Sequence, residues 1–140
     1  MLHAYHFQKI EKDISSLLKS CIADLGVYQL PAIVIEIPKD ISYGHLSTNL
    51  ALRVSAVLKK TPLEIADAIA ICCKNKLKEF RLDKIIEDIK TAHPGFINFY
   101  LKDSFFYEMV KEILSKSDDF GRIDLAKKEK IKIEFVSANP

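Results

Sequence analysis

The segment from residue 84 to residue 101 constrains the fold more than any other part of the sequence. Residues 96–101, Phe-Ile-Asn-Phe-Tyr-Leu, predict a strand because Phe, Ile and Tyr are enriched in strands, and residues 84–91 predict a second, weaker strand. Between them lies Ala92-His93-Pro94-Gly95, which has the composition of a turn. Two strands joined by so short a connection pair as an antiparallel hairpin, so we expect an antiparallel sheet.

Apolar periodicity assigns elements to most of the remaining chain. Residues 2–25 predict an amphipathic helix that stops at Gly26. The β-branched run 32–37 predicts a strand that is buried on at least one face. Further helices are expected from Ser47 or Thr48 to residue 60, from the capping box Thr61-Pro62-Leu63-Glu64 to about residue 77, and from a cap at Asp103 or Ser104 to residue 114. This order predicts an α+β fold, a small antiparallel sheet covered by helices.

The length and composition fit one folded domain with a short appendage. The chain has 140 residues, of which 49% are hydrophobic and 29% charged, and its net charge of +2 excludes a strongly basic nucleic-acid binder. Cys21 and Cys72 occupy apolar positions of the predicted helices, and Cys73 directly follows Cys72. We expect free, buried thiols, which favour a reducing, cytoplasmic compartment. No segment has the pattern of a leader or a membrane span.

Strand 96–101 offers a candidate binding surface. Alternation places Ile97, Phe99 and Leu101 on one face, and Phe96, Asn98 and Tyr100 on the other. Two aromatic rings beside an amide suit an unpaired nucleotide, because rings stack on a base and the amide offers both a donor and an acceptor. The alternative is that the rings simply cover the rest of the core. The scattered histidines and the few glycines predict no metal site, nucleophile or phosphate loop, so the chain alone is expected to be inactive.

The end of the chain predicts a strand without a following domain. Ile131, Ile133 and Phe135 alternate with charged residues, and Ser137-Ala138-Asn139-Pro140 follows. One interpretation is a simple edge strand. The other, which we favour, is that the chain is the front part of a longer protein, with the polar residues 115–129 as a linker.

Three segments together resemble one known family. Tyr43-Gly44-His45-Leu46-Ser47-Thr48-Asn49-Leu50-Ala51, followed by Thr61-Pro62-Leu63-Glu64-Ile65-Ala66, is similar to the N-terminal domain of arginyl-tRNA synthetases. Pro94-Gly95-Phe96-Ile97-Asn98-Phe99 is similar to the hairpin of that domain. Residues 134–140, Glu-Phe-Val-Ser-Ala-Asn-Pro, resemble the opening strand of the family's class I catalytic domain.

The resemblance implies a division of labour along the chain. Residues 1–115 would be a domain that binds the D-loop, at the elbow of arginine tRNA, through Phe96 and Asn98, with His93 a further candidate. Residues 116–130 would be a linker, and 131–140 the first strand and loop of the catalytic domain. The matching arginine contacts there are Glu134, Ser137 and Asn139, in which a carboxylate and an amide suit an α-ammonium group.

The chain should end just before the family's HIGH-type ATP motif. The resemblance therefore implies no cofactor in this part, whereas the whole enzyme would use ATP and Mg²⁺ to attach arginine to tRNA, as a cytoplasmic monomer without a membrane anchor. One departure is His45, where the family usually has aspartate after the glycine, which puts the role of that aspartate in doubt here. A stand-alone RNA-binding module and a protein-interaction module remain as alternatives.

Overall fold

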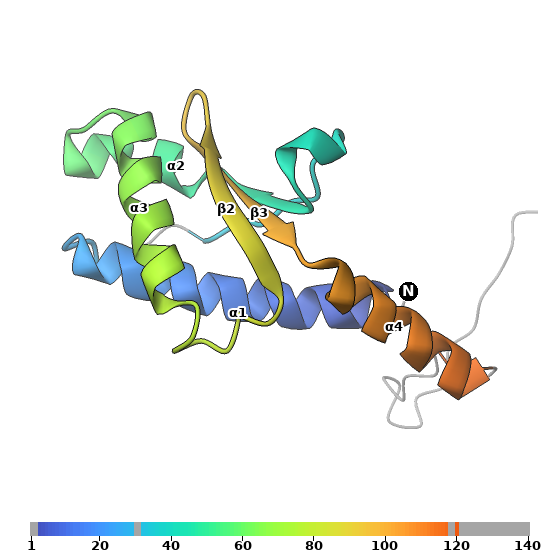
Figure 1. Ribbon diagram of the computed structural model, residues 1–140. Helices are drawn as coiled ribbons and strands as arrows, with labels where there is room; N and C mark the ends of the chain where they lie inside the picture. The colour runs from blue at the N-terminus through green and yellow to red at the C-terminus, as the bar shows by residue number, and fades with distance from the viewer. Residues whose placement is uncertain (1–2, 30–31, 118–119, 121–140) are drawn as a thin grey trace, which may run out of the picture.

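The computed structural model describes residues 3–29, 32–117 and 120 of the chain. Figure 1 shows their arrangement, in which a small sheet lies against three helices while a fourth helix extends from the end of the last strand. In chain order the elements are α1 (His3–Asp24), the 3-10 helix η1 (Ile41–Tyr43), β1 (Leu46–Thr48), α2 (Leu50–Leu58), α3 (Pro62–Lys76), β2 (Ile86–Ala92), β3 (Phe96–Leu101) and α4 (Asp103–Lys116). The predicted α+β class, with a small antiparallel sheet covered by helices, is confirmed.

The sheet is antiparallel in the strand order β1-β3-β2. The predicted hairpin is therefore present as β2 and β3, and β3 is the central strand. In the register, Ile97 of β3 lies opposite Thr48 on one side and Thr91 on the other, and Asn98 lies opposite Ser47 and Lys90. Residues that are directly opposite share a face, so this register fixes which side chains meet on each side of the sheet.

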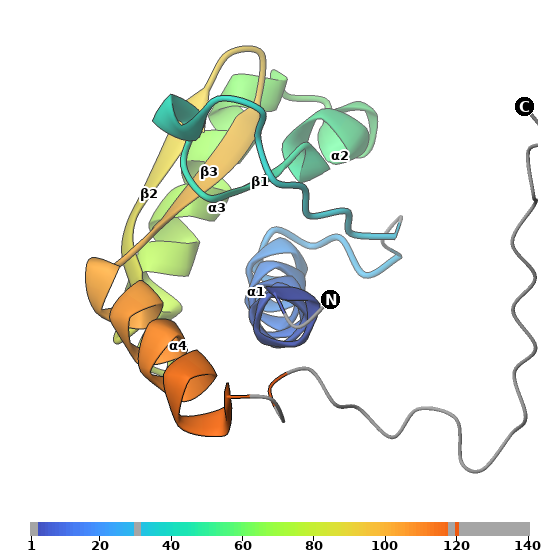
Figure 2. The same ribbon diagram turned by 90° about the vertical axis from the view of Figure 1, so that its right-hand side faces the viewer.

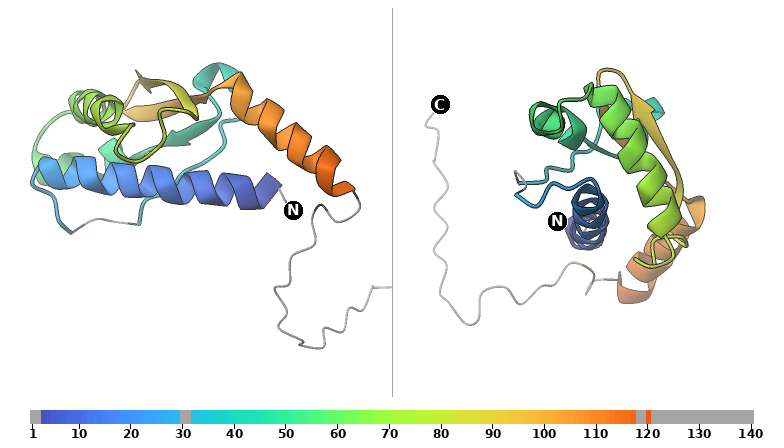
Figure 3. Two further views of the ribbon diagram at one scale, coloured as in Figure 1. Left: turned by 60° about the horizontal axis from the view of Figure 1, so that its bottom comes forward. Right: turned by 90° about the vertical axis from the view of Figure 1, so that its left-hand side faces the viewer.

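One face of the sheet packs against α1, α2 and α3. On β3 this face carries Ile97, Phe99 and Leu101, which are buried as predicted. Figure 2 shows α1 almost end-on below the sheet, and Figure 3 shows its length running beneath the strands. The core that they enclose contains fully or almost fully buried residues from every layer, among them Ile14, Leu17, Leu18, Ile22, Leu46, Leu50, Val54, Ile65, Ile69 and Ile89.

Two of the predicted helix signals are confirmed in detail. Thr61 Oγ1 accepts a hydrogen bond from Glu64 N, and the Glu64 carboxylate accepts one from Thr61 N, which is a complete capping box. Helix α1 ends before Gly26, whose φ of +83° is a conformation that glycine adopts without strain. None of the helices in the described part of the chain is long and apolar enough to cross a membrane.

The predicted strand at residues 32–37 does not form, and only Glu36 pairs with the sheet, through an isolated bridge to Ser47. The expected burial on one face is found in part, because Ile33 and Ile35 are partly buried against the core, whereas Val34 and Ile37 are 41% and 63% exposed. The neighbouring β1 is three residues long and offers few ladder positions. Thr48 donates its side-chain hydroxyl to the Val34 carbonyl over 2.7 Å, so a side-chain bond replaces part of the ladder.

The predicted start of the second helix is also wrong. Ser47 and Thr48 belong to β1, which the sequence analysis missed, and α2 begins at Leu50. Serine and threonine occur at helix caps as well as in strands, because their hydroxyls can hydrogen-bond to the first N–H groups of a helix or to other nearby groups. Here the Ser47 hydroxyl bonds to Asn98 and that of Thr48 to Val34, both outside the helix.

Smaller corrections concern single positions. Helix α3 turns Cys73 rather than Cys72 into the core, where its sulfur lies 3.6 Å from that of Cys21, and all three thiols are free. Helix α4 has Lys102 at its N-cap, without a side-chain cap bond, instead of Asp103 or Ser104. The predicted linker lies outside the described residues except for 116, 117 and 120, and the predicted strand 131–140 lies outside them altogether.

Candidate nucleic-acid interface

The three predicted RNA contacts of the hairpin line one hollow on the sheet face opposite the core. Its volume is about 330 Å³, and we call it the hairpin pocket. His93, Phe96 and Asn98 line it together with Glu36, Pro38, Tyr43, Ser47 and Ala92. Two parts of the chain meet there: the segment from Glu36 to Ser47, which includes η1 and part of β1, and the hairpin from Ala92 to Asn98.

Asn98 forms part of the pocket lining in a buried position. It is 3% exposed, and its Oδ1 accepts a hydrogen bond from Ser47 Oγ over 2.7 Å. Among the described residues, the only buried side-chain polar atom without a partner is Asn49 Oδ1. Asn98 Nδ2 has no hydrogen-bond partner among the described residues and is not fully buried, and Asn98 lines the pocket. The Asn98 amide nitrogen is therefore a candidate hydrogen-bond donor to a ligand in the pocket.

Tyr43 adds a second aromatic side chain to the pocket beside Phe96. Phe96 is half-buried, whereas Tyr43 is 54% exposed at the end of η1. The loop that carries Tyr43 is held by Asp40, whose Oδ1 accepts a hydrogen bond from Ser42 N over 2.9 Å. Backbone hydrogen bonding from Ser42 lowers the pKa of Asp40, so the carboxylate remains a charged cap at neutral pH.

Two close backbone contacts seat the loops around the pocket. Gly44 has a φ of +86°, and a Cβ there would lie 2.8 Å from the Phe99 carbonyl oxygen. At the turn, a Cβ on Gly95 would lie 2.6 Å from Pro62 Cβ and 2.9 Å from its carbonyl carbon. Only glycine allows the backbone to come this close at both positions. Gly44 therefore lets the η1 loop lie directly against β3, and Gly95 lets the hairpin turn lie directly against the start of α3.

A positive charge lies on the same face, beside the pocket. Lys90 is opposite Asn98 in the register, and its Nζ lies 4.7 Å from the centre of the Tyr100 ring. That ring is held by its hydroxyl, which donates to the Ser42 carbonyl over 2.8 Å. Asp88 pairs with Lys74 at 2.9 Å but lies 3.9 Å from Lys90, so Lys90 is only weakly neutralised.

His45 lies outside the pocket and has a structural role. Its Nδ1 accepts a hydrogen bond from Leu101 N over 2.9 Å, and its backbone N–H donates to the Phe99 carbonyl. Its ring centre lies 4.9 Å from that of Phe106 on α4. His45 therefore joins the η1 loop to the end of β3 and to α4.

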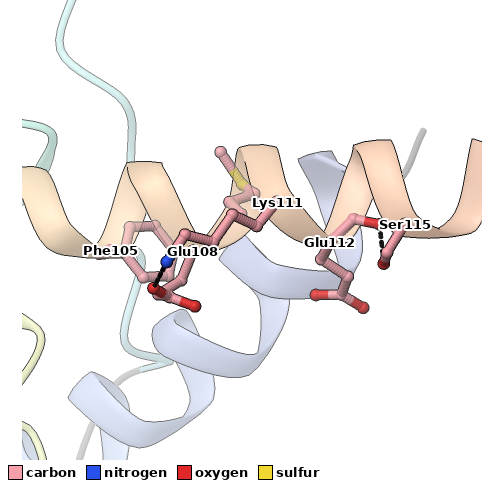
Figure 4. Close-up of a pocket in the computed structure, with 6 residues that line it drawn as sticks. Phe105, Glu108, Lys111, Glu112 and Ser115 are labelled. Atoms are coloured by element: carbon pink, nitrogen blue, oxygen red, sulfur yellow. Dashed lines mark hydrogen bonds and ion pairs between the residues drawn. The ribbon is translucent and has the colours of Figure 1, made fainter.

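Other candidate sites in the described residues offer less. A hollow along α4, drawn in Figure 4, is lined by Phe105, Glu108, Met109, Lys111, Glu112 and Ser115, all from that single helix. No group of three or more His, Cys, Asp or Glu in the described residues could hold a metal ion. Burial raises the pKa of Cys72 to about 12, which leaves little thiolate to act as a nucleophile at neutral pH.

Ser47 and Tyr43 line the pocket, although the sequence did not predict them as site residues. Tyr43 stands in the segment that resembles the family, but its position over the sheet follows from the η1 turn. Ser47 meets Asn98 only through the register of a strand that the periodicity did not predict. The arginine contacts Glu134, Ser137 and Asn139 lie outside the described residues.

Comparison with known proteins gives a consistent result. Residues 8–101 match the family model described as the arginyl tRNA synthetase N terminal domain. Proteins named arginine–tRNA ligase from Listeria welshimeri, Oceanobacillus iheyensis and Bacillus velezensis are 42%, 40% and 36% identical over 80%, 80% and 90% of this chain.

The chain spans only about a fifth of the length of these curated relatives, with coverage of 19%, 19% and 21%. The family match nevertheless includes every strand of the sheet and all the residues that line the hairpin pocket. This chain belongs to the arginyl-tRNA synthetase family and carries its N-terminal domain.

Proposed function

We propose that this chain binds the D-loop at the elbow of arginine tRNA and that the hairpin pocket receives an unpaired base. The observation that carries the proposal is the meeting of Phe96, Asn98 and His93 in one hollow, with the Asn98 amide nitrogen unpaired among the described residues. Phe96 offers a ring for stacking, which contributes about 1–3 kcal/mol per base. Asn98 offers donors to the base edge, and the exposed His93 lies at the rim.

The whole protein would then be an ATP-dependent arginine–tRNA ligase. We propose residues 1–115 as the tRNA-binding domain, 116–130 as a linker, and 131–140 as the start of the catalytic domain, with Glu134, Ser137 and Asn139 as arginine contacts. We propose that this ligase uses ATP and Mg²⁺ to attach arginine to the tRNA. A cytoplasmic monomer fits this function. The family match does not favour a stand-alone RNA-binding or protein-interaction module.

Titration of the 140-residue chain with an arginine tRNA transcript tests the pocket. We expect the Phe96→Ala/Asn98→Ala double variant to bind at least tenfold more weakly, because it loses both the stacking ring and the amide donors. Tyr107→Ala is the matched control, since Tyr107 is 66% exposed on α4 and does not line the pocket. Equal affinity of the double variant and the wild type would place the RNA on another surface.

A further inference from the structure

A row of four side chains crosses the sheet at the hairpin pocket, with opposite charges at its two ends. Glu36 lies opposite Ser47 through an isolated bridge, and Asn98 stands between Ser47 and Lys90 in the register. Directly opposite residues share a face of the sheet, so a carboxylate lies at one end of the row and an ammonium group at the other. Because Glu36 lines the pocket, an anionic group of a ligand is repelled from that end and attracted to the end at Lys90.

The ammonium group of Lys90 lies over an aromatic ring that is itself fixed. Lys90 Nζ is 4.7 Å from the centre of the Tyr100 ring, and the Tyr100 hydroxyl donates to the Ser42 carbonyl over 2.8 Å. The Lys90 side chain is 58% exposed, so its ammonium group is open to a ligand from the solvent. A lysine ammonium is a compact charge with three donors, which suits a phosphate oxygen.

Lys74 on α3 holds the carboxylate of Asp88 away from Lys90. Asp88 Oδ1 lies 2.9 Å from Lys74 Nζ, whereas Asp88 Oδ2 lies 3.9 Å from Lys90 Nζ. The same Oδ1 accepts a hydrogen bond from Ile89 N over 2.7 Å, which fixes the carboxylate further on the side of Lys74. The charge of Lys90 is therefore left largely available because a second lysine engages the nearest carboxylate.

We propose that Lys90 binds a backbone phosphate of the RNA whose base enters the hairpin pocket, and that Lys74 is a positioning residue that keeps Lys90 available by holding Asp88. Lys90 then fixes the direction in which the nucleotide lies, with its phosphate at the β2 end of the row. Phosphate contacts carry no sequence information, but they position a nucleic acid and make its affinity depend on salt. This inference rests on the proposed RNA-binding function of the pocket.

The salt dependence of RNA binding tests the role of Lys90. Titration with an arginine tRNA transcript between about 50 and 200 mM salt gives the slope of log affinity against log salt concentration. We expect Lys90→Met to reduce the magnitude of this slope by about 0.7–0.9, the contribution of one phosphate contact, and to weaken binding about two- to fivefold at the lowest salt. Lys111→Met is the matched control with the wild-type slope, since it removes the same charge from α4, outside the pocket.

A double-mutant cycle tests the role of Lys74. Lys74→Met frees the Asp88 carboxylate to pair with Lys90, so it should weaken RNA binding, whereas Asp88→Asn should strengthen it, each by about 1.5- to threefold. Combined with Asp88→Asn, Lys74→Met should have no further effect, because no carboxylate remains to be released. Glu108→Gln is the control for Asp88→Asn, since it changes the net charge equally and removes the partner of Lys111 on α4.

The outcomes separate this inference from the function on which it rests. Should Lys90→Met keep the wild-type slope, Lys90 binds no phosphate, even where the Phe96→Ala/Asn98→Ala variant shows that the pocket holds the RNA. If Lys74→Met weakens binding equally with and without Asp88→Asn, Lys74 does not act through Asp88. If the wild type binds no transcript, the proposed function itself fails. Thermal unfolding of each variant checks that these substitutions of exposed side chains leave the fold intact.

Discussion

The side chain of His45 accepts a hydrogen bond from the backbone at the end of β3. Its Nδ1 accepts the N–H of Leu101, which is 1% exposed, over 2.9 Å. The Oδ1 of an aspartate is the same number of bonds from the backbone as Nδ1 of a histidine, so an aspartate at position 45 can reach the same N–H. His45→Ala should lower the free energy of unfolding by about 1–3 kcal/mol, because a buried donor loses its acceptor.

His45→Asp should recover part of this loss, although it gives up the contact between the histidine ring and Phe106. Urea unfolding followed by circular dichroism measures both variants against the wild type. Equal stability of the alanine and aspartate variants would show that the Leu101 contact contributes nothing. Tyr43 and Asn98 are untouched by either change, so tRNA affinity serves as a check that the pocket is preserved.

At the scale of elements, the hairpin and α3 are joined through the contact of Gly95 with Pro62. A Cβ at Gly95 would lie 2.6 Å from Pro62 Cβ and 2.9 Å from the Pro62 carbonyl carbon, so Gly95→Ala must push the turn away from α3. We expect a loss of about 1–3 kcal/mol in stability together with weaker tRNA binding, because His93 and Phe96 move with the turn. Gly26→Ala is the control: its φ is also positive, but no atom lies within 4 Å of the added Cβ.

Gly26→Ala should therefore cost about 1 kcal/mol of backbone strain and leave tRNA affinity unchanged. Thermal or urea unfolding gives the first quantity, and titration with an arginine tRNA transcript gives the second. If both glycine variants bind tRNA as the wild type does, the seating of the turn on α3 does not position the pocket residues.

The elements that were predictable from sequence are those whose signals are local. The hairpin, α1 and the capping box of α3 each follow from periodicity or from residues three or four apart. Strand β1 could not be found in this way, because Ser47 and Thr48 have the chemistry of a helix cap and become a strand only by pairing with β3. The face on which Asn98 lies was predictable from the alternation along β3. The position of Ser47 depends on the register between β1 and β3, and that of Tyr43 depends on the η1 turn.

Across the whole molecule, α3 is tied to a layer on either side by an ion pair. Lys76 pairs with Asp24 of α1 at 2.7 Å, and Lys74 pairs with Asp88 of β2 at 2.9 Å. Hydrogen bonding from Lys76 lowers the pKa of Asp24, and that from Lys74 lowers the pKa of Asp88. Both pairs are exposed enough that they add little to stability at neutral pH, so their effect is best measured as a change with pH.

The sign of this pH dependence follows from the direction of each pKa change. A carboxylate with a lowered pKa in the folded chain takes up protons first in the unfolded chain, so its contribution is complete above the ordinary value of 3.8 and is lost as the pH falls below it. Hydrogen bonding to Asp24 raises the pKa of Lys76, whose contribution is complete below 10.5 and is lost as the pH rises above it.

We therefore expect stability to be level between about pH 5 and pH 10 with respect to these groups, and to fall on both sides. Asp24→Asn should flatten both limbs, because it removes the partner of Lys76 as well as its own titration, and Asp88→Asn should flatten the acid limb. Glu79→Gln is the control, since Glu79 is exposed and forms no ion pair with the described residues. Urea unfolding from pH 2.5 to pH 11 tests the prediction, and an acid limb that is equally steep in all three variants would contradict it.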